Sequence, residues 1–310
     1  MVEQLLQETV VLSVLAATLR IATPLLLAAL GEMLSERCGV YNMGLEGTML
    51  TGAFTGFAVA FMTGSPWAGM AAAALSGALV GVLLAVLAIG LRVEQIITGL
   101  ALNLLASGLT TFLFKVLFRN STPAIPIFMP WPVPALAELP WLGPVLFQQK
   151  APTYLALLAV PAAWLLLYRT RLGLELRCIG ENAKALDSKG RNVFRRQVGA
   201  VVGGAALAGL GGAFLSVGSA TQYVPDMTNG RGWLAIIIVI AGGWRPWPIL
   251  LAALAFAFIE ALQLQIQGVG LHIPFQILLA LPYLAGLAAL ALYRSGARAP
   301  AMLGQPYSRE

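Results

Sequence analysis

The sequence predicts an all-α polytopic membrane protein, because its composition is strongly apolar and its apolar residues fall into long stretches. Of 310 residues, 59% are hydrophobic and only 10% are charged, whereas soluble domains have roughly 45–50% apolar and about 25% charged residues. So few charges could not cover a water-facing surface, which excludes a soluble enzyme. We interpret the net charge of +6 as a marker of membrane orientation and expect no nucleic-acid partner.

About nine stretches are apolar enough to enter a membrane, since a spanning helix needs about 20 predominantly apolar residues. They lie near residues 9–35, 45–63, 67–91, 96–118, 152–168, 197–218, 232–244, 249–267 and 275–293. The first contains Arg20 and Pro24, and the seventh is too short to cross as a regular helix. We therefore expect both to be broken or re-entrant, which lipid tolerates only where protein or a cavity covers the freed backbone groups.

Small residues recur at four-residue spacing in several of these stretches. In lipid, such ladders let helix backbones approach closely, because packing rather than hydrophobic burial drives association there. The ladders predict a compact helical bundle and are Gly52, Gly56 and Ala60; Ala73, Gly77, Gly81 and Ala85; and Gly204, Ala208 and Gly212.

The basic residues predict which loops face the cytoplasm. Segment 169–196 holds eight of the 19 Lys and Arg residues, so the positive-inside rule places it inside. Alternating the stretches from there puts the outer loop, about 119–151, and the N-terminus outside. The loops with Arg37, Arg92 and Arg245 and the C-terminal tail then lie in the cytoplasm. The first 19 residues contain no Lys or Arg, so we expect the first apolar segment to be retained rather than cleaved as a signal peptide.

Residues for enzymatic chemistry are scarce. The single histidine, His272, has no cluster of metal-ligating neighbours and is expected to be solvated or packed. Cys38 and Cys178 are too few and too far apart for a disulfide framework or a metal motif. No lysine follows a glycine, so the chain has no P-loop. We predict a protein that is not an enzyme and has no metal or cofactor; if ATP drives it, another chain hydrolyses the ATP.

Three polar residues are predicted to border a path for a solute. Asn42 and Glu46 lie in the glycine-interrupted segment 31–47, and Asn103 lies in the middle of an apolar stretch; polar groups inside a membrane are costly and point to a pathway or a buried contact. The alternative for the first segment is a cytoplasmic turn whose Glu46 caps the next helix. For Asn103, as for Glu260, the alternative is a contact between helices.

Helix-forming residues lie between Gly180 and Gly190. This pattern predicts a short exposed helix that ends at a glycine. It is either an orientation signal only or a docking surface for a cytoplasmic partner. In the second case Glu181, Asn182 and Asp187 are the expected polar anchors.

These same residues resemble a known family. RLGLELRCIGENAKALDSKGRNVFRRQ, followed by a Gly/Ala-rich stretch, resembles the cytoplasmic segment of ABC importer permeases of the ribose and branched-chain amino acid type. ERCGVYNMGLEGTMLTGAF resembles the branch of simple-sugar and nucleoside permeases, and the resemblance continues through IITGLALNLLASGLT, AIIIVIAGGWRPW and APAMLGQPY, over about residues 20–308. Ala183 stands where the family usually has proline, and Lys189 and Arg191 replace small or apolar residues. The ribose-type permeases also carry a span ahead of the matched region.

The resemblance implies a single transmembrane permease domain over residues 1–310, with the bundle of the vitamin B12 importer class, in a prokaryotic plasma membrane. It implies a second permease subunit, identical or different, a cytoplasmic ATPase with two fused nucleotide-binding domains, and an extracytoplasmic substrate-binding protein. The short helix between Gly180 and Gly190 would couple ATP hydrolysis to import of a nucleoside or simple sugar. The alternative from another class is a secondary transporter or channel that acts without ATP, and an intramembrane enzyme comes third.

Overall fold

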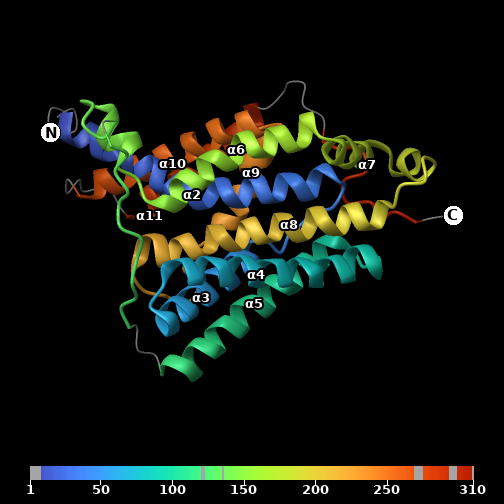
Figure 1. Ribbon diagram of the computed structural model, residues 1–310, viewed down its shortest axis with the longest axis horizontal. Coiled ribbons are helices and arrows are strands. Elements are labelled where there is room, and N and C mark those ends of the chain that lie inside the picture. The colour runs from blue at the N-terminus through green and yellow to red at the C-terminus, as the bar shows by residue number, and fades with distance from the viewer. Residues whose placement is uncertain (1–7, 120–122, 135, 269–274, 293–298, 309–310) are drawn as a thin grey trace.

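The computed structural model describes residues 8–119, 123–134, 136–268, 275–292 and 299–308. Apart from an isolated β-bridge between Pro130 and Lys150, the regular structure of these residues is helical, which confirms the predicted all-α class (Figure 1). In chain order the elements are α2 (Glu8–Arg37), α3 (Leu45–Thr63), α4 (Pro66–Ala85), η1 (Val86–Gly90), α5 (Gln95–Phe118), η2 (Gly143–Phe147), α6 (Ala151–Arg169), α7 (Arg171–Asp187), α8 (Val193–Ala213), η3 (Phe214–Ala220), α9 (Arg231–Ala241), α10 (Pro246–Gly268) and α11 (Phe275–Leu292).

Seven helices of the described residues are long and apolar enough to cross a membrane: α2, α3, α4 with η1, α5, α6, α8 with η3, and α10. Helix α9 has 11 residues and is therefore about 16 Å long, too short for a hydrocarbon layer of about 30 Å. This agrees with the prediction that the seventh stretch cannot cross as a regular helix. The count of nine membrane segments depends in addition on α9 and α11 and stays a prediction.

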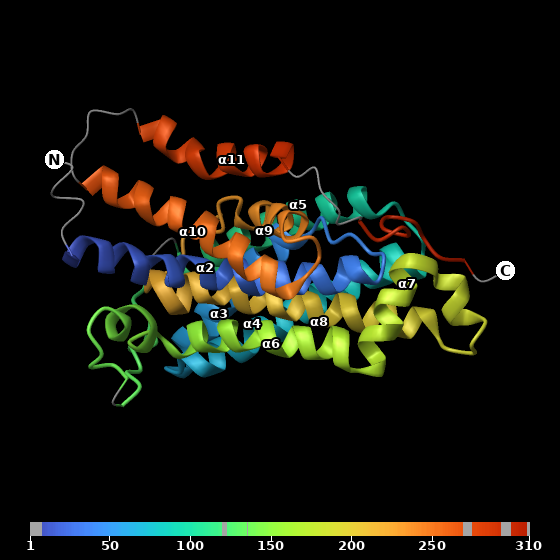
Figure 2. The same cartoon turned by 90° about the horizontal axis from the view of Figure 1, so that it is seen from above.

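Helix α2 is continuous through Pro24, so the expected break in the first stretch is wrong. The proline removes one backbone hydrogen bond, but every residue from Ala22 to Glu36 is buried. Helix α2 packs against α8, α10, α9 and α6, and Figure 2 shows it in the middle of the bundle. Packing on all sides therefore compensates for the lost bond.

The loops gather at two opposite ends of the bundle. At one end, here called the α7 end, Tyr41 N donates to Gln95 Oε1 at 2.8 Å and Met302 N donates to Gly180 O at 2.8 Å. At the opposite end, Ile125 N donates to Thr221 O at 3.2 Å and the rings of Trp67 and Phe128 lie 4.8 Å apart. Figure 1 shows α7 and the C-terminal segment at one end and residues 123–150 at the other. Which end faces the cytoplasm stays a prediction.

The centre of the bundle is built on close backbone approaches. A Cβ atom on Gly52 would overlap the backbone of Gly209, and one on Gly31 would overlap the carbonyl oxygen of Gly204. Helices α2, α3 and α4 all pack on α8 at such points. The predicted small-residue ladders are therefore the contact surfaces of the bundle, as expected where packing drives helix association.

Several sequence predictions fall outside the described residues. These are the position of His272, the N-terminus at residues 1–7, and the basic residues Arg294 and Arg298 of the C-terminal region.

Candidate functional site

Asn103, on the neighbouring helix α5, holds the backbone where α3 begins. Its Oδ1 accepts a hydrogen bond from Gly47 N at 2.7 Å, and its Nδ2 donates to Met43 O at 2.8 Å. Gly47 N is a donor of the first turn of α3 that the helix cannot satisfy itself, and Met43 O belongs to the turn just before the helix. For Asn103 the structure thus shows a contact between helices, which the sequence analysis gave as the alternative to a role at the path.

Asn42 lies in the turn between α2 and α3 and is buried. Its backbone N donates to Glu32 Oε1 at 2.9 Å, which ties the turn back to α2. The side-chain Oδ1 is buried without a hydrogen-bond partner among the described residues. A role of Asn42 at the translocation path stays a prediction.

Glu46 caps the N-terminus of α9 rather than its own helix. Its Oε1 accepts from Gly230 N at 2.8 Å and its Oε2 accepts from Gly232 N at 2.6 Å. A Cβ atom on Gly232 would lie 2.6 Å from Glu46 Cα, so only glycine lets α9 approach so closely. The carboxylate satisfies backbone donors at the start of a helix and opposes the positive end of its dipole. Glu46 therefore positions the start of α9 inside the bundle.

A polar pocket lies directly beside this capped helix start. It has a volume of about 620 Å³ between α9, α10 and α11. Arg231 Nη2 and Glu260 Oε1 form an ion pair at 2.6 Å inside it, and Tyr283 OH donates to Asn229 O at 3.0 Å. The six polar lining residues are Asn229, Arg231, Glu260, Gln263, Gln267 and Tyr283.

Of these lining residues, the sequence analysis named only Glu260, with a contact between helices as the alternative to a role in a pathway. The ion pair between Glu260 and Arg231 of α9 is such a contact. The signal for the pocket was present in α10. Residues 260, 263 and 267 recur at intervals of three and four and so share one face of the helix, and all three are polar in a segment whose other residues, apart from Gln265, are apolar.

A second hollow of about 820 Å³ continues from the polar pocket and shares Arg231 and Leu264 with it. Arg20 and Lys150 line this hollow as well. Lys150 Nζ donates to Gly218 O at 2.6 Å, and burial, together with the nearby positive charge of Arg20, lowers the pKa of its ammonium group. The second hollow thus adds the cationic residues Arg20 and Lys150 to the donors and acceptors of the polar pocket, and most of its other lining residues are apolar.

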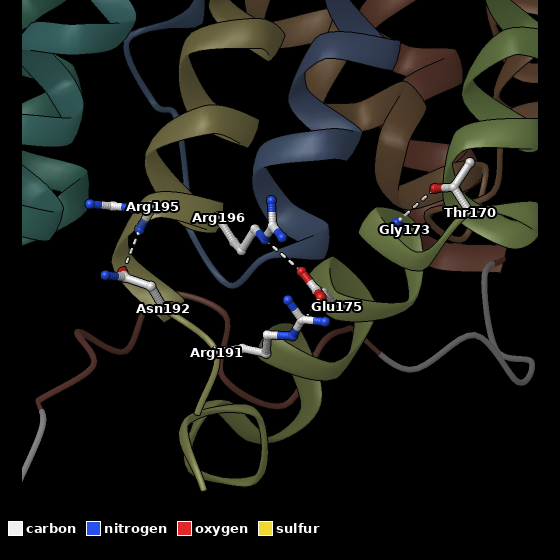
Figure 3. Close-up of polar contacts among 7 residues, drawn as sticks. All are labelled: Thr170, Gly173, Glu175, Arg191, Asn192, Arg195 and Arg196. Carbon is white, nitrogen blue, oxygen red and sulfur yellow. Dashed lines mark hydrogen bonds and ion pairs between the residues drawn. The ribbon is translucent and has the colours of Figure 1, made fainter. Parts of the chain in front are cut away.

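At the α7 end, α7 is fixed against α8 (Figure 3). Glu175 on α7 pairs with Arg196 Nε of α8 at 2.5 Å and with Arg191 Nε at 3.5 Å. Thr170 Oγ1 caps α7 by accepting from Gly173 N at 3.1 Å, and Asn192 Oδ1 caps α8 by accepting from Arg195 N at 2.9 Å. Both helices are thus capped at their N-termini. One ion pair joins α7 to α8, and the second joins α7 to the loop between them.

The predicted short helix starts later than expected. Residues 171–181 continue α7, and the break comes at Asn182, whose φ of −158° and ψ of 94° are not helical. Its Oδ1 accepts from Ala185 N at 3.1 Å, so Asn182 caps the short segment that ends at Asp187. Gly190 follows with a φ of +72°, which agrees with the predicted glycine end.

Gly180 is a packing residue inside α7 and does not begin the short helix. A Cβ atom there would overlap Arg37 O at the end of α2, and Gly180 O accepts from Met302 N. Asp187 Oδ2 accepts from Tyr307 OH at 3.0 Å. The C-terminal residues 302–307 therefore tie the short helix to Gly180, and Gly180 itself packs on the end of α2. Glu181 and Asn182 are exposed beside this contact.

The chain matches a known family over most of its length. Residues 14–293 match the family model described as branched-chain amino acid transport system / permease component. The chain is 40% identical to a putative glucose ABC transporter permease protein of Haloferax volcanii, over 96% of this chain and 97% of that protein. It is 35% identical to a guanosine ABC transporter permease protein of Bacillus subtilis and to a nucleoside ABC transporter permease protein of Lactococcus lactis subsp. cremoris, each over 95% of this chain and 96% of the relative. No solved structure matches the chain.

Each of these three organisms holds a second, more distant relative with the same named substrate. A further nucleoside ABC transporter permease protein of Lactococcus lactis subsp. cremoris is 26% identical over 78% of this chain and 70% of that protein. A further glucose ABC transporter permease protein of Haloferax volcanii is 30% identical over 76% of this chain and 65% of that protein. A further guanosine ABC transporter permease protein of Bacillus subtilis is 26% identical over 76% of this chain and 69% of that protein. The relatives thus occur in pairs of unequal similarity to this chain.

Proposed function

This chain belongs to the family of permease components of branched-chain amino acid transport systems, and we propose from that premise that it is the permease subunit of an ABC importer for a nucleoside or a simple sugar. The full-length similarity to a putative glucose permease and a guanosine permease supports this substrate class. The observation that carries the proposal is the polar pocket around Arg231 and Glu260, where six polar side chains meet between apolar helices. Polar groups are retained at such depth for a pathway or a buried contact.

The chemistry of the pocket favours an uncharged polar solute. Arg231 and Glu260 neutralise one another, so the pocket offers no net charge from this pair. The amides of Gln263 and Gln267 and the hydroxyl of Tyr283 present both donors and acceptors. Sugar hydroxyls and the edges of a nucleobase need such a mixture, and they need no counter-ion.

We propose that Asn42, Glu46 and Asn103, which the sequence predicts to border the path, act on it indirectly by positioning backbone. Glu46 holds the turn that carries Asn229 and Arg231, through Gly230 N and Gly232 N. Asn103 fixes the backbone beside Glu46, at Met43 and Gly47. Asn42 ties the turn between α2 and α3, which leads to Glu46, back to α2 through Glu32. In this proposal the three residues border the path by setting the position of the start of α9.

We propose that the end of α7 couples the permease to an ATPase. Glu181 and Asn182 are exposed there, and Asp187 bonds to Tyr307. Gly180 packs against the end of α2, and Gly190 ends the segment. Force applied at this segment would reach α2 through Gly180 and α8 through Glu175. Lys189 and Arg191 make the segment basic, which suits an acidic groove on the partner.

The remaining parts of the proposal concern the assembly. The segment 169–196 faces the cytoplasm with the C-terminus, whereas residues 119–151 and the N-terminus face outward. A tandem-domain ATPase, a second permease and an extracytoplasmic binding protein complete the transporter, with the bundle of the vitamin B12 importer class and nine membrane segments. The paired glucose and guanosine permease relatives support a second permease that differs from this one.

Uptake by cells that lack this chain tests the proposed function. Disruption of its gene should abolish uptake of labelled nucleosides or of a labelled monosaccharide by the host, and the wild-type gene should restore it. Uptake of both solute classes at the wild-type rate in the disrupted strain would contradict the proposal. A matched strain complemented with the Glu260→Gln variant tests whether the polar pocket is involved.

A further inference from the structure

Three arginines and three aromatic side chains line one groove at the α7 end of the bundle. The groove has a volume of about 880 Å³. It lies where α2 and α6 end, beside α7 and the turn between α9 and α10. We call it the arginine groove and define it by Arg37, Trp164, Tyr168, Arg177, Arg245 and Trp247. No acidic side chain of the described residues lines it.

The positive charge of this groove is poorly neutralised. The described ion pairs of the chain involve Arg191, Arg196 and Arg231, and none involves a groove arginine. Glu181 is the acidic residue that acts electrostatically on Arg37, whereas Arg177 and Arg245 act on it as like charges. Like charges that face one groove repel one another, and an anion between them would relieve that repulsion.

One donor in the groove lacks an acceptor. The Arg177 guanidinium lies over the Tyr168 ring at 4.8 Å, and its Nε is buried without a hydrogen-bond partner among the described residues. A buried N–H without an acceptor costs free energy. Phosphate oxygens would supply the missing acceptor and a charge that matches the guanidinium.

The groove also lies at the boundary of the apolar layer. Helix α6 ends at Arg169 and α10 begins at Pro246, and Trp164, Tyr168 and Trp247 mark the level at which amphipathic rings lie in membrane proteins. Away from the groove, α6 exposes Leu165 and α10 exposes Leu251, whose exposed fractions are 50% and 68%. A free phosphate ion would not use these apolar surfaces, but the acyl chains of a lipid would.

We propose that the arginine groove binds the phosphate headgroup of an anionic phospholipid, with the acyl chains along Leu165 and Leu251. The site rests on the proposed orientation, in which the α7 end faces the cytoplasm, because basic pockets between transmembrane helices on that side suit such headgroups. This site is separate from the polar pocket of the proposed transport path, and its test involves no transport. The bound lipid fills the space between α2, α6 and α7 next to the segment proposed to contact the ATPase.

Quenching of tryptophan fluorescence by brominated lipids tests the site directly. The purified, delipidated transporter is titrated in mixed micelles with dibrominated phosphatidylglycerol or with dibrominated phosphatidylcholine. The chain has seven tryptophans, so the quenching at the groove is the part that a Trp164→Phe/Trp247→Phe variant loses. This part should saturate at a lower mole fraction of the anionic lipid. The double variant Arg177→Gln/Arg245→Gln should lose roughly tenfold of that preference. The control Arg171→Gln removes an exposed arginine of α7 that does not line the groove and should leave the preference unchanged.

A single variant and three further outcomes decide whether the arginine groove binds an anionic lipid. Arg245 is exposed, so the single variant Arg245→Gln keeps the fold and should by itself weaken binding of the anionic lipid. An unchanged lipid preference in both variants would overturn the proposal. Displacement of the brominated lipid by inorganic phosphate at the same concentration would identify a free-phosphate site instead. Loss of ATPase co-purification with unchanged lipid preference would identify a protein contact.

Discussion

Arg37 binds the backbone of Trp244 across the α7 end of the bundle. Its guanidinium donates to the Trp244 carbonyl oxygen from Nε at 2.9 Å and from Nη2 at 2.7 Å. The neighbouring Glu36 accepts a hydrogen bond from the indole Nε1 of the same tryptophan. Two adjacent residues of α2 thus hold one residue of the turn between α9 and α10, and Trp244 has a φ of +55° there. This clamp fixes α9 at its C-terminal end, while Glu46 fixes it at its start.

The Trp244→Phe variant should be less stable than the wild type. It removes the indole N–H but keeps an aromatic ring, so Glu36 Oε2 is left buried without a partner. The expected loss is about 1–3 kcal/mol, measured as a lower midpoint of thermal unfolding in detergent. Trp233→Phe is the control, since Trp233 is 38% exposed; an equal effect of both variants would contradict the clamp.

The Gly209→Ala variant should disrupt the packing of α8. A Cβ atom at Gly209 would overlap Ala73 O of α4, so the helices must separate and we expect a loss of about 2–4 kcal/mol. Gly203→Ala is the control on the same helix, because nothing lies within 4 Å of a Cβ atom there. That control should gain up to about 1 kcal/mol from helix propensity. The prediction fails if unfolding midpoints of the two variants coincide.

The Asn103→Ala variant should lose stability rather than substrate affinity. It leaves Gly47 N and Met43 O without their partners, which we expect to cost about 1–3 kcal/mol. Uptake kinetics with the matched variant Gln263→Leu, which removes an amide of the polar pocket, provide the comparison. We expect Gln263→Leu to raise KM, and Asn103→Ala to lower the amount of folded transporter with KM unchanged. A raised KM in Asn103→Ala would place its side chain in contact with the substrate.

The Glu181→Arg variant should detach the ATPase. Glu181 is exposed beside the break at Asn182, so the charge reversal alters the proposed contact surface without burying a new charge. Co-purification of the ATPase with the tagged permease should fall at least about tenfold. The control Glu138→Arg changes an exposed residue at the opposite end of the bundle. Full recovery of the ATPase with Glu181→Arg would remove this segment from the coupling contact.

The fold was largely predictable because lipid restricts what a chain can do. Backbone groups in hydrocarbon must be satisfied within the segment, so the apolar stretches could only be helices, and the ladders of small residues marked the surfaces that touch. Helix α2 shows the limit of this reasoning. Its local signals, Arg20 and Pro24, indicate a break, but burial against α8 and α10 overrides them. Burial by neighbouring helices cannot be inferred from the segment alone.

The candidate site was predicted less well, because its residues come together only in three dimensions. Asn103 and Glu46 were conspicuous as polar residues in apolar surroundings, yet their partners are backbone groups of other helices. The polar pocket joins residues 229–231 to residues of α10 and α11 that are far away in sequence. At Gly180 the sequence showed a glycine, but it could not show that the end of α2 occupies the place of its side chain.

ATP-driven uptake by the reconstituted transporter tests whether this chain is the permease subunit of an ABC importer. The permease, its partner permease and the ATPase are placed in proteoliposomes, and accumulation of labelled guanosine and labelled glucose is followed with the binding protein added. We predict accumulation of one of these solutes that requires ATP. The pair variant Arg231→Gln/Glu260→Gln should lower the rate at least about tenfold while the ATPase stays bound. Accumulation without ATP, or a wild-type rate in the pair variant, would contradict the account.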